Sequence, residues 1–222
     1  PETDTDFGSK MDSFSKKYLK KIKTIDGFIL KTDSPSCGVY SAKIYPKKTN
    51  APATKRSSGF FATHVLKTFP DHPIEEEKRL NDVFIRENFY TSIFTLSDFR
   101  NVSTIDSLYK YHAKHKYLFM AYNQKLMKEM GNIAANKENK SIKLVIKNYL
   151  KTLLILLSER SKTTKNINTQ MHVMGYFKKL LKAKEKKHFL DTLDLYRNKK
   201  VPISTVNAIL VSWITRFGND YL

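Results

Sequence analysis

The chain has 222 residues, of which 41% are hydrophobic and 27% charged, and its formal net charge is +19. This apolar content excludes a disordered tail, and the length suits one large domain or two small ones. One cysteine excludes an internal disulfide framework. The polar, acidic start is unlike a secretory leader, and lysines interrupt the strongest apolar stretch, 144–157. We therefore expect a cytoplasmic protein with no membrane partner.

The positive charge lies mainly in the second half of the chain. Residues 1–104 carry a net charge of +4, and residues 105–222 carry +15. Such an asymmetry indicates two units with different roles. Together with twelve tyrosines and fourteen phenylalanines, it makes nucleic acid the expected partner of the second half. The alternative is that AT-rich codon bias and solubility alone produced a lysine-rich surface.

The first predicted element is a helix over residues 12–25. Phe14, Tyr18 and Ile22 recur at four-residue spacing, which is typical of the buried stripe of an amphipathic helix, and lysines lie between them. Asp12 is expected to cap the first turn. The pair Asp26-Gly27 is expected to end this helix.

The next segments predict an α/β portion. The apolar run 27–31 predicts a buried strand, and a second short strand is expected at 39–45. In such sheets ligands bind at the carboxyl ends of strands, so the loop 32–38 is the expected position of a site. The rest of this half is predicted as a mobile loop at 50–59, a helix at 60–69, a loop at 71–77 in which Glu75, Glu76 and Glu77 cap a helix, and a partly helical segment at 79–100.

Beyond Ser103 the sequence predicts helices alone. The fold class is therefore a partial parallel sheet with helices, followed by an all-α helical bundle, and α+β overall. We expect domains at 1–90 and 105–222, joined by a linker helix at 91–104. The bundle is predicted to have about five helices, at 104–130, 141–157, 167–181, 185–197 and 204–217, with connections at 131–140 and 158–166 and Ser204 as the N-cap of the last helix.

Cys37 lies in the sequence Ser34-Pro35-Ser36-Cys37-Gly38, directly after the predicted buried strand. A loop at a strand end presents backbone N–H groups that can lower the pKa of a thiol, whereas an incidental free cysteine is the alternative. One cysteine cannot build a zinc site or an iron–sulfur cluster alone. The residues themselves therefore leave the role of this cysteine open.

The segment Ile25–Gly38 resembles the last cysteine motif of the thiouracil desulfidase family, and residues 59–80 resemble the end of that domain. The resemblance implies a [4Fe-4S] cluster held by three cysteines, whose open iron takes sulfur from a pyrimidine thiocarbonyl. It makes Cys37 a cluster ligand, with Ser34 and Ser36 beside it as candidate catalytic residues. The other two cysteines of the family belong to a portion that this chain lacks. We expect a fragment whose full-length parent binds the cluster while this chain cannot, or else a degenerate protein.

The second half resembles the YbgA-like domain, most clearly at 111–121 and 168–179. His112 and His115 lie three residues apart on one helix face, so they could share a metal ion, pack inside the bundle or face RNA. Lysine and arginine neutralise phosphates, and tyrosine, histidine and arginine planes stack on splayed bases. The candidate RNA contacts are His112, His115, Lys116, His172, Lys178, Lys179 and Arg197.

The order of the two domains resembles that of two-domain desulfidases that act on 4-thiouridine in transfer RNA. This resemblance implies an enzyme, at least in the full-length parent, that removes sulfur without redox chemistry while the helical domain binds tRNA or other RNA. One alternative is a non-catalytic nucleic-acid-binding protein that carries a remnant desulfidase domain. The other is a desulfidase of free thiopyrimidines, against which the +15 charge of the second half argues. No carboxylate stands out as a general acid or base.

Overall fold

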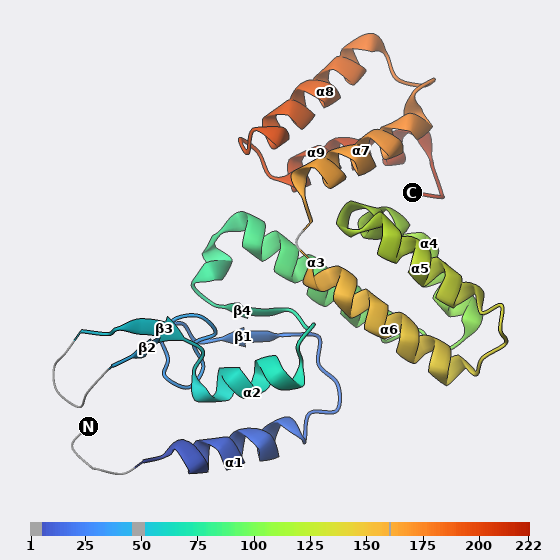
Figure 1. Cartoon of the computed structure of the whole chain (residues 1–222). Helices are drawn as coiled ribbons and strands as arrows, with labels where there is room; N and C mark the ends of the chain where they lie inside the picture. The colour runs from blue at the N-terminus through green and yellow to red at the C-terminus, as the bar shows by residue number, and fades with distance from the viewer. Residues whose placement is uncertain (1–5, 46–51, 160) are drawn as a thin grey trace. The chain divides into compact units, whose positions relative to one another are not determined.

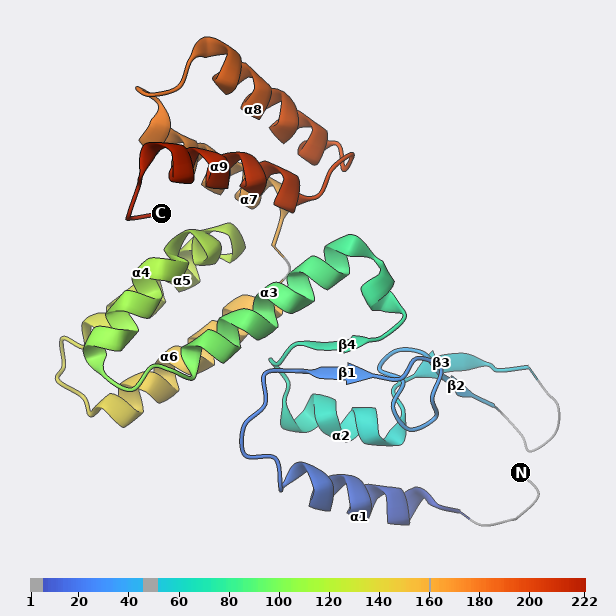
Figure 2. The ribbon, with the colours of Figure 1, turned by 180° about the vertical axis from the view of Figure 1, so that it is seen from behind.

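The computed structural model describes residues 6–45, 52–159 and 161–222, and the chain forms two compact units. Unit 1 ends at Ser97 and unit 2 begins at Asp98. Unit 1 combines short strands with helices, whereas the described part of unit 2 is helical (Figures 1 and 2). The α+β fold class predicted from the sequence is therefore confirmed.

A parallel strand pair lies at the centre of unit 1. β1 (Phe28–Leu30) pairs with β4 (Ile74–Glu76), so that Leu30 lies opposite Glu76. α2 (Phe60–Thr68) lies between this pair and α1 (Gly8–Leu19), which forms the next layer (Figures 1 and 2). The predicted helix at 60–69 is thus confirmed. The core consists of Leu19, Phe28, Leu30, Val39, Ala62 and Val65, with Cys37 packed against it.

Two strands occupy segments that were expected to be loops. β4 lies within 71–77, and β3 (Lys55–Ser57) lies within 50–59, where it pairs antiparallel with β2 (Ala42–Ile44). All three residues of β3 are exposed, so no apolar alternation marks it in the sequence. β4 carries two glutamates, and their burial depends on partners far away in the chain.

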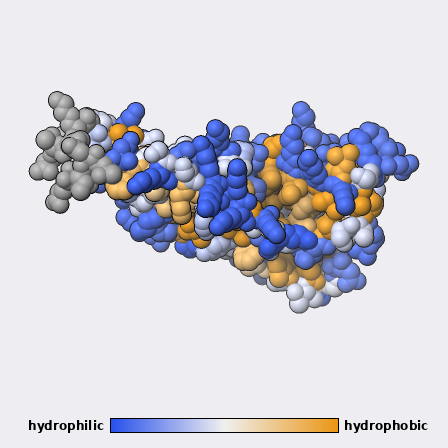
Figure 3. Space-filling view, turned by 90° about the horizontal axis from the view of Figure 1, so that it is seen from below, coloured by the Kyte–Doolittle hydropathy of each residue, from blue (hydrophilic) through white to orange (hydrophobic). Residues whose placement is uncertain are grey.

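The first helix begins earlier than expected and buries another face. α1 starts at Gly8, so Asp12 lies inside it and pairs with His64 of α2 at 2.8 Å instead of capping its start. Phe14 is 57% exposed and Tyr18 is 50% exposed, whereas the buried residues of the helix are Ser15 and Leu19. On the face seen in Figure 3, hydrophobic residues reach the surface among hydrophilic ones.

The segment 79–100 is more helical than expected, since a short 3-10 turn, η1 (Arg79–Asn81), leads into α3 (Val83–Phe99). The described residues of unit 2 form six further helices, one more than expected. They are α4 (Ile105–Tyr122), α5 (Gln124–Ala135), α6 (Ile142–Ser158), α7 (Thr163–Phe177), α8 (Ala183–Arg197) and α9 (Ile203–Phe217).

The additional helix arises at Asn123, which divides the predicted helix 104–130. The backbone of Asn123 is extended, and its side chain accepts hydrogen bonds from two amides of the first turn of α5. α5 then continues into the predicted connection and ends at Ala135, and the next residue, Asn136, has a left-handed φ of 42°. Ser204 lies inside α9, whose N-cap position is Pro202, so the predicted serine cap is wrong.

Aromatic side chains fill the interior of unit 2. Phe99 stacks on Tyr149 and meets Tyr111 edge-on, and Phe119 is fully buried beside them. A second cluster gathers buried hydrophobic residues of α7, α8 and α9 and of the turn between α7 and α8, namely Val173, Phe177, Leu181, Phe189, Leu193, Tyr196, Val206, Leu210 and Trp213. Every helix in the described part of the chain falls short of the length or apolar character that a membrane span needs.

Candidate functional site

The loop that carries Cys37 leaves the carboxyl end of β1, which is the position expected for a site in a parallel sheet. The pairing of the strands continues one step beyond β1, because the Glu77 amide donates to the Leu30 carbonyl at 3.1 Å. The loop then turns back toward β2. Its position is therefore set by groups on β4 and on the residues just after it.

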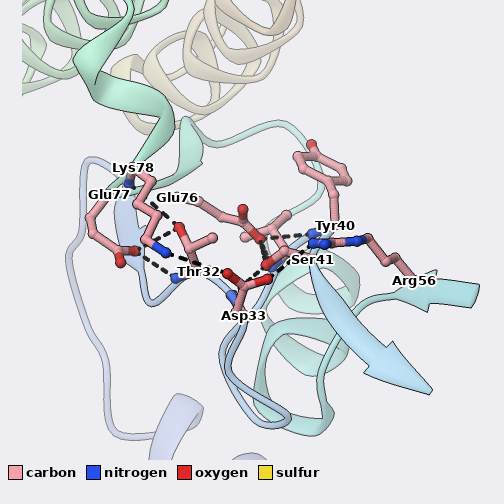
Figure 4. A network of polar contacts seen from close by, with 9 residues as sticks. Thr32, Asp33, Tyr40, Ser41, Arg56, Glu76, Glu77 and Lys78 are labelled. Atoms are coloured by element: carbon pink, nitrogen blue, oxygen red, sulfur yellow. Dashed lines mark hydrogen bonds and ion pairs between the residues drawn. The ribbon is translucent and has the colours of Figure 1, made fainter. Parts of the chain in front are cut away.

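Glu76 holds this loop from the neighbouring strand (Figure 4). Its Oε1 accepts hydrogen bonds from the amides of Val39 at 2.6 Å and Tyr40 at 3.0 Å, and from the Ser41 hydroxyl at 2.7 Å. Burial acts to raise the pKa of Glu76, which is 2% exposed, but these three donors outweigh it and the pKa is lowered. The helix-capping role predicted for residues 75–77 is wrong, because Glu75 and Glu76 lie on β4 and Glu77 follows this strand directly.

Glu77 and Asp33 fasten the same loop closer to the solvent (Figure 4). Glu77 accepts hydrogen bonds from the Lys31 ammonium at 2.7 Å and from the Thr32 amide at 2.6 Å. The Lys31 contact is the largest of the effects that lower the pKa of Glu77 to about 2. Asp33 has a left-handed φ of 58°, which aspartate tolerates better than most residues, and pairs with Arg56 at 3.0 Å.

Ser34 organises the turn around Cys37. Its hydroxyl oxygen accepts hydrogen bonds from the amides of Ser36 at 3.2 Å and Cys37 at 3.0 Å. The carbonyls of Pro35 and Ser36 accept from two amides in the first turn of α2. This close approach requires glycine at position 59, because a Cβ there would lie 2.4 Å from the Ser36 carbonyl oxygen. The hydroxyl of Ser34 thus supports the loop, and a catalytic role for either serine stays a prediction.

The residues present do not suffice for a [4Fe-4S] cluster with three cysteine ligands. The sequence supplies Cys37 and no second cysteine. Within the described ranges no three histidine, cysteine or acidic side chains gather where they could hold a metal ion. Since such clusters are held by several thiolates, this chain can contribute one cysteine ligand at most.

His112 and His115 both contact groups inside unit 2. Nδ1 of His112 lies 2.8 Å from the Tyr149 hydroxyl, and Nε2 of His115 lies 2.8 Å from the Asp98 carboxylate. Burial lowers the pKa of both histidines; Lys116 lowers that of His112 further, whereas Asp98 opposes the shift of His115. These contacts favour packing inside unit 2 as the role of both histidines, and contact with RNA stays a prediction for them.

The other predicted RNA contacts are distributed over three helices. His172 lies on α7, and Lys178 and Lys179 lie in the turn that follows it; all three are exposed. Arg197 ends α8 and is exposed, although its guanidinium pairs with an aspartate three residues earlier. Lys116 lies on α4 and is half-buried. His172, Lys178 and Lys179, which lie on α7 and directly after it, therefore form the most accessible part of the predicted RNA interface.

Two features are not among the candidate site residues named from the sequence. One is Glu76, whose partners are 35 to 37 residues away in the chain. The other is a cluster of Tyr117, Tyr176 and Tyr221. The sequence predicts a loop at 71–77, so it gives no signal for the role of Glu76. Helical spacing favours a core position for the tyrosines and leaves Tyr176 ambiguous between the core and a stacking surface.

Comparisons with known proteins match the two halves of the chain to different families. Residues 1–77 match the family model described as 2-thiouracil desulfurase, and residues 116–222 match the model of a protein of unknown function, DUF1722. "Uncharacterized protein YbgA" of Escherichia coli (strain K12) is 26% identical over 101 residues. The alignment covers 45% of this chain and 60% of that relative. No solved structure matches the chain. The two matches give the chain the organisation that its sequence predicted, a 2-thiouracil desulfurase-like segment followed by a DUF1722 segment similar to YbgA.

Proposed function

We propose that this chain is part of a desulfidase that removes sulfur from 4-thiouridine in transfer RNA and that unit 2 holds the RNA. The observation that carries the proposal is the position of Cys37, in a fixed loop at the carboxyl end of β1, inside the segment that matches the 2-thiouracil desulfurase family. A family of this kind indicates removal of sulfur as the reaction. The RNA as substrate is inferred from the charge of unit 2.

The proposed reaction replaces the thiocarbonyl sulfur by the oxygen of water. The base gains a carbonyl group, the sulfur leaves as sulfide with the protons of the water, and no oxidant or reductant is consumed. In this proposal Cys37 supplies one ligand of an iron–sulfur cluster, and the other ligands come from residues outside this chain. Glu76 and Ser34 keep the loop in the shape that presents Cys37, through their hydrogen bonds to its backbone.

Unit 2 supports the second part of the proposal through its charge. Residues 98–222 carry a net charge of +15, which a free thiopyrimidine base would not require. A polyanion of many phosphates would benefit from such a charge, because each neutralised phosphate releases condensed counterions. Transfer RNA is therefore favoured over a small substrate.

Binding of bulk transfer RNA to this chain should weaken steeply with salt. With about six phosphate contacts, affinity should fall roughly a thousandfold between about 50 mM and 200 mM salt. Replacing Lys178 and Lys179 by alanine should reduce the slope of log affinity against log salt by about one for each lost phosphate contact. Fluorescence anisotropy with labelled tRNA measures both effects.

The matched control replaces Lys17 and Lys20 by alanine. These lysines are also exposed, but they lie on and just after α1 in unit 1. Their removal should leave the salt slope close to that of the wild type. If tRNA does not bind even at low salt, both this proposal and the non-catalytic nucleic-acid-binding alternative are contradicted.

A further inference from the structure

Three tyrosines from distant parts of unit 2 form one cluster at its surface. The hydroxyls of Tyr117 and Tyr176 lie 2.5 Å apart. Tyr176 stacks on Tyr221, with ring centroids 5.8 Å apart, and Tyr117 meets both rings edge-on. The Tyr221 amide donates to the side chain of Asn219, which fixes the chain after α9. The rings of Tyr176 and Tyr221 are therefore held in place although their residues are 45% and 52% exposed.

The face of α7 beside this cluster is open. Gly175 and Tyr176 follow His172 by three and four residues, so both lie near His172 on the surface of the helix, and all three are exposed. A Cβ at Gly175 would meet nothing within 4 Å. The fold thus does not require a glycine at this position, where it weakens the helix relative to alanine. The exposed glycine therefore carries no side chain of its own over this part of the helix.

Positive charge adjoins the same face. Lys178 and Lys179 follow α7 directly and are exposed. The hydroxyls of Tyr117 and Tyr176 point toward each other. The exposed surface of Tyr176 therefore includes part of its ring. Aromatic rings next to lysines are the combination that binds single-stranded nucleic acid, because every base has a face that can stack and every nucleotide carries a phosphate.

We propose that Tyr176 and Tyr221, braced by Tyr117, form a stacking platform for an unpaired RNA base. The base lies against the rings next to Gly175, and Lys178 and Lys179 bind the adjoining phosphates. This inference rests on the proposed function, because it assumes that unit 2 holds RNA. It adds a preference for unpaired nucleotides, since a base inside a duplex cannot present its face to the rings.

The test measures binding of a short labelled oligouridylate and of an RNA duplex of the same length by fluorescence anisotropy. Tyr176→Leu and Gly175→Leu should each weaken binding of the single strand by roughly fivefold to a hundredfold, as expected for one lost base–aromatic contact. Neither variant should change the salt slope or the affinity for the duplex. The Cβ of a leucine at position 175 meets nothing within 4 Å, and leucine favours a helix more than glycine does, so the melting temperature should not fall.

Two control variants should bind the single strand as tightly as the wild type. Tyr176→Phe keeps the ring and loses the hydroxyl, and Tyr109→Leu removes a tyrosine that is 47% exposed on α4. If oligouridylate binds with a steep salt dependence but Tyr176→Leu and Gly175→Leu bind it as the wild type does, the platform is refuted while the proposed function stands. If neither the oligouridylate nor transfer RNA binds the wild type, both are refuted.

Discussion

Replacing Glu76 by alanine should destabilise the Cys37 loop by about 3 kcal/mol, because buried donors that lose a charged acceptor keep their desolvation penalty. The Val39 residue is fully buried, and its amide donates to Glu76 at 2.6 Å. A loss of this size should speed hydrogen exchange at the amides of Val39 and Tyr40 roughly a hundredfold. Hydrogen exchange with peptide-level mass spectrometry, on a peptide that spans residues 33–41, measures it.

Glu75→Ala is the matched control for this prediction. Glu75 lies on the same strand and is 7% exposed, but its carboxylate binds Arg79 at 2.6 Å instead of the loop. Its removal should change exchange at Val39 and Tyr40 far less. If both variants speed hydrogen exchange at Val39 and Tyr40 equally, the hydrogen bonds of Glu76 do not specifically stabilise the loop.

Acid should act on the wild-type loop in the same direction as the Glu76 substitution. The pKa of Glu76 in the folded protein lies below its usual value of 4.5. The stabilisation is therefore complete above that value and is lost as the pH falls through the lowered pKa. Glu76→Gln cannot ionise, so exchange in this variant should lack this part of the acid dependence.

Replacing Phe189 by alanine should cost unit 2 about 3–5 kcal/mol, the usual penalty for emptying an aromatic position in a core. Phe189 is 0% exposed, and its ring centroid lies 5.2 Å from that of Trp213. Urea unfolding followed by the fluorescence of this tryptophan, the one in the sequence, reports the change within unit 2.

Leu190→Ala tests the same helix without emptying the core. Leu190 is 42% exposed, so its truncation should shift the urea midpoint only slightly. If Phe189→Ala unfolds at the same urea concentration as Leu190→Ala, the cluster formed by α7, α8 and α9 is not the core that stabilises unit 2. Under conditions where Phe189→Ala is unfolded, binding of RNA to unit 2 should also be lost.

The sequence predicts the helices of unit 2 well where an apolar pattern is long, as in α6. It fails where a partner decides the outcome. The aromatic period of Phe14 and Tyr18 predicts a buried stripe, yet both residues are at least half exposed, and the buried residues of α1 are Ser15 and Leu19. β3 and β4 have three residues each and no apolar alternation, so strand pairing with distant segments defines them.

The candidate site shows the same division between local and distant information. Cys37 follows an apolar run and a turn, so its place at a strand end can be predicted locally. The role of Glu76 depends on pairing of β1 with a strand more than 40 residues later, and the Tyr117–Tyr176 contact spans 59 residues. His112 and His115 have partners on α6 and α3, which helical spacing on α4 alone does not reveal.

We expect a 4-thiouridine of transfer RNA to reach the Cys37 loop while unit 2 holds the molecule. Long-wavelength ultraviolet light crosslinks 4-thiouridine to the residues that it touches, so the thiolated base itself serves as the probe. Irradiation of this chain with thiolated tRNA, followed by peptide mapping, should give a crosslink within residues 31–41, and tRNA without 4-thiouridine should give none. Crosslinks confined to unit 2, with tRNA fully bound, would show that the thiolated base does not reach the Cys37 loop and would contradict the proposed function.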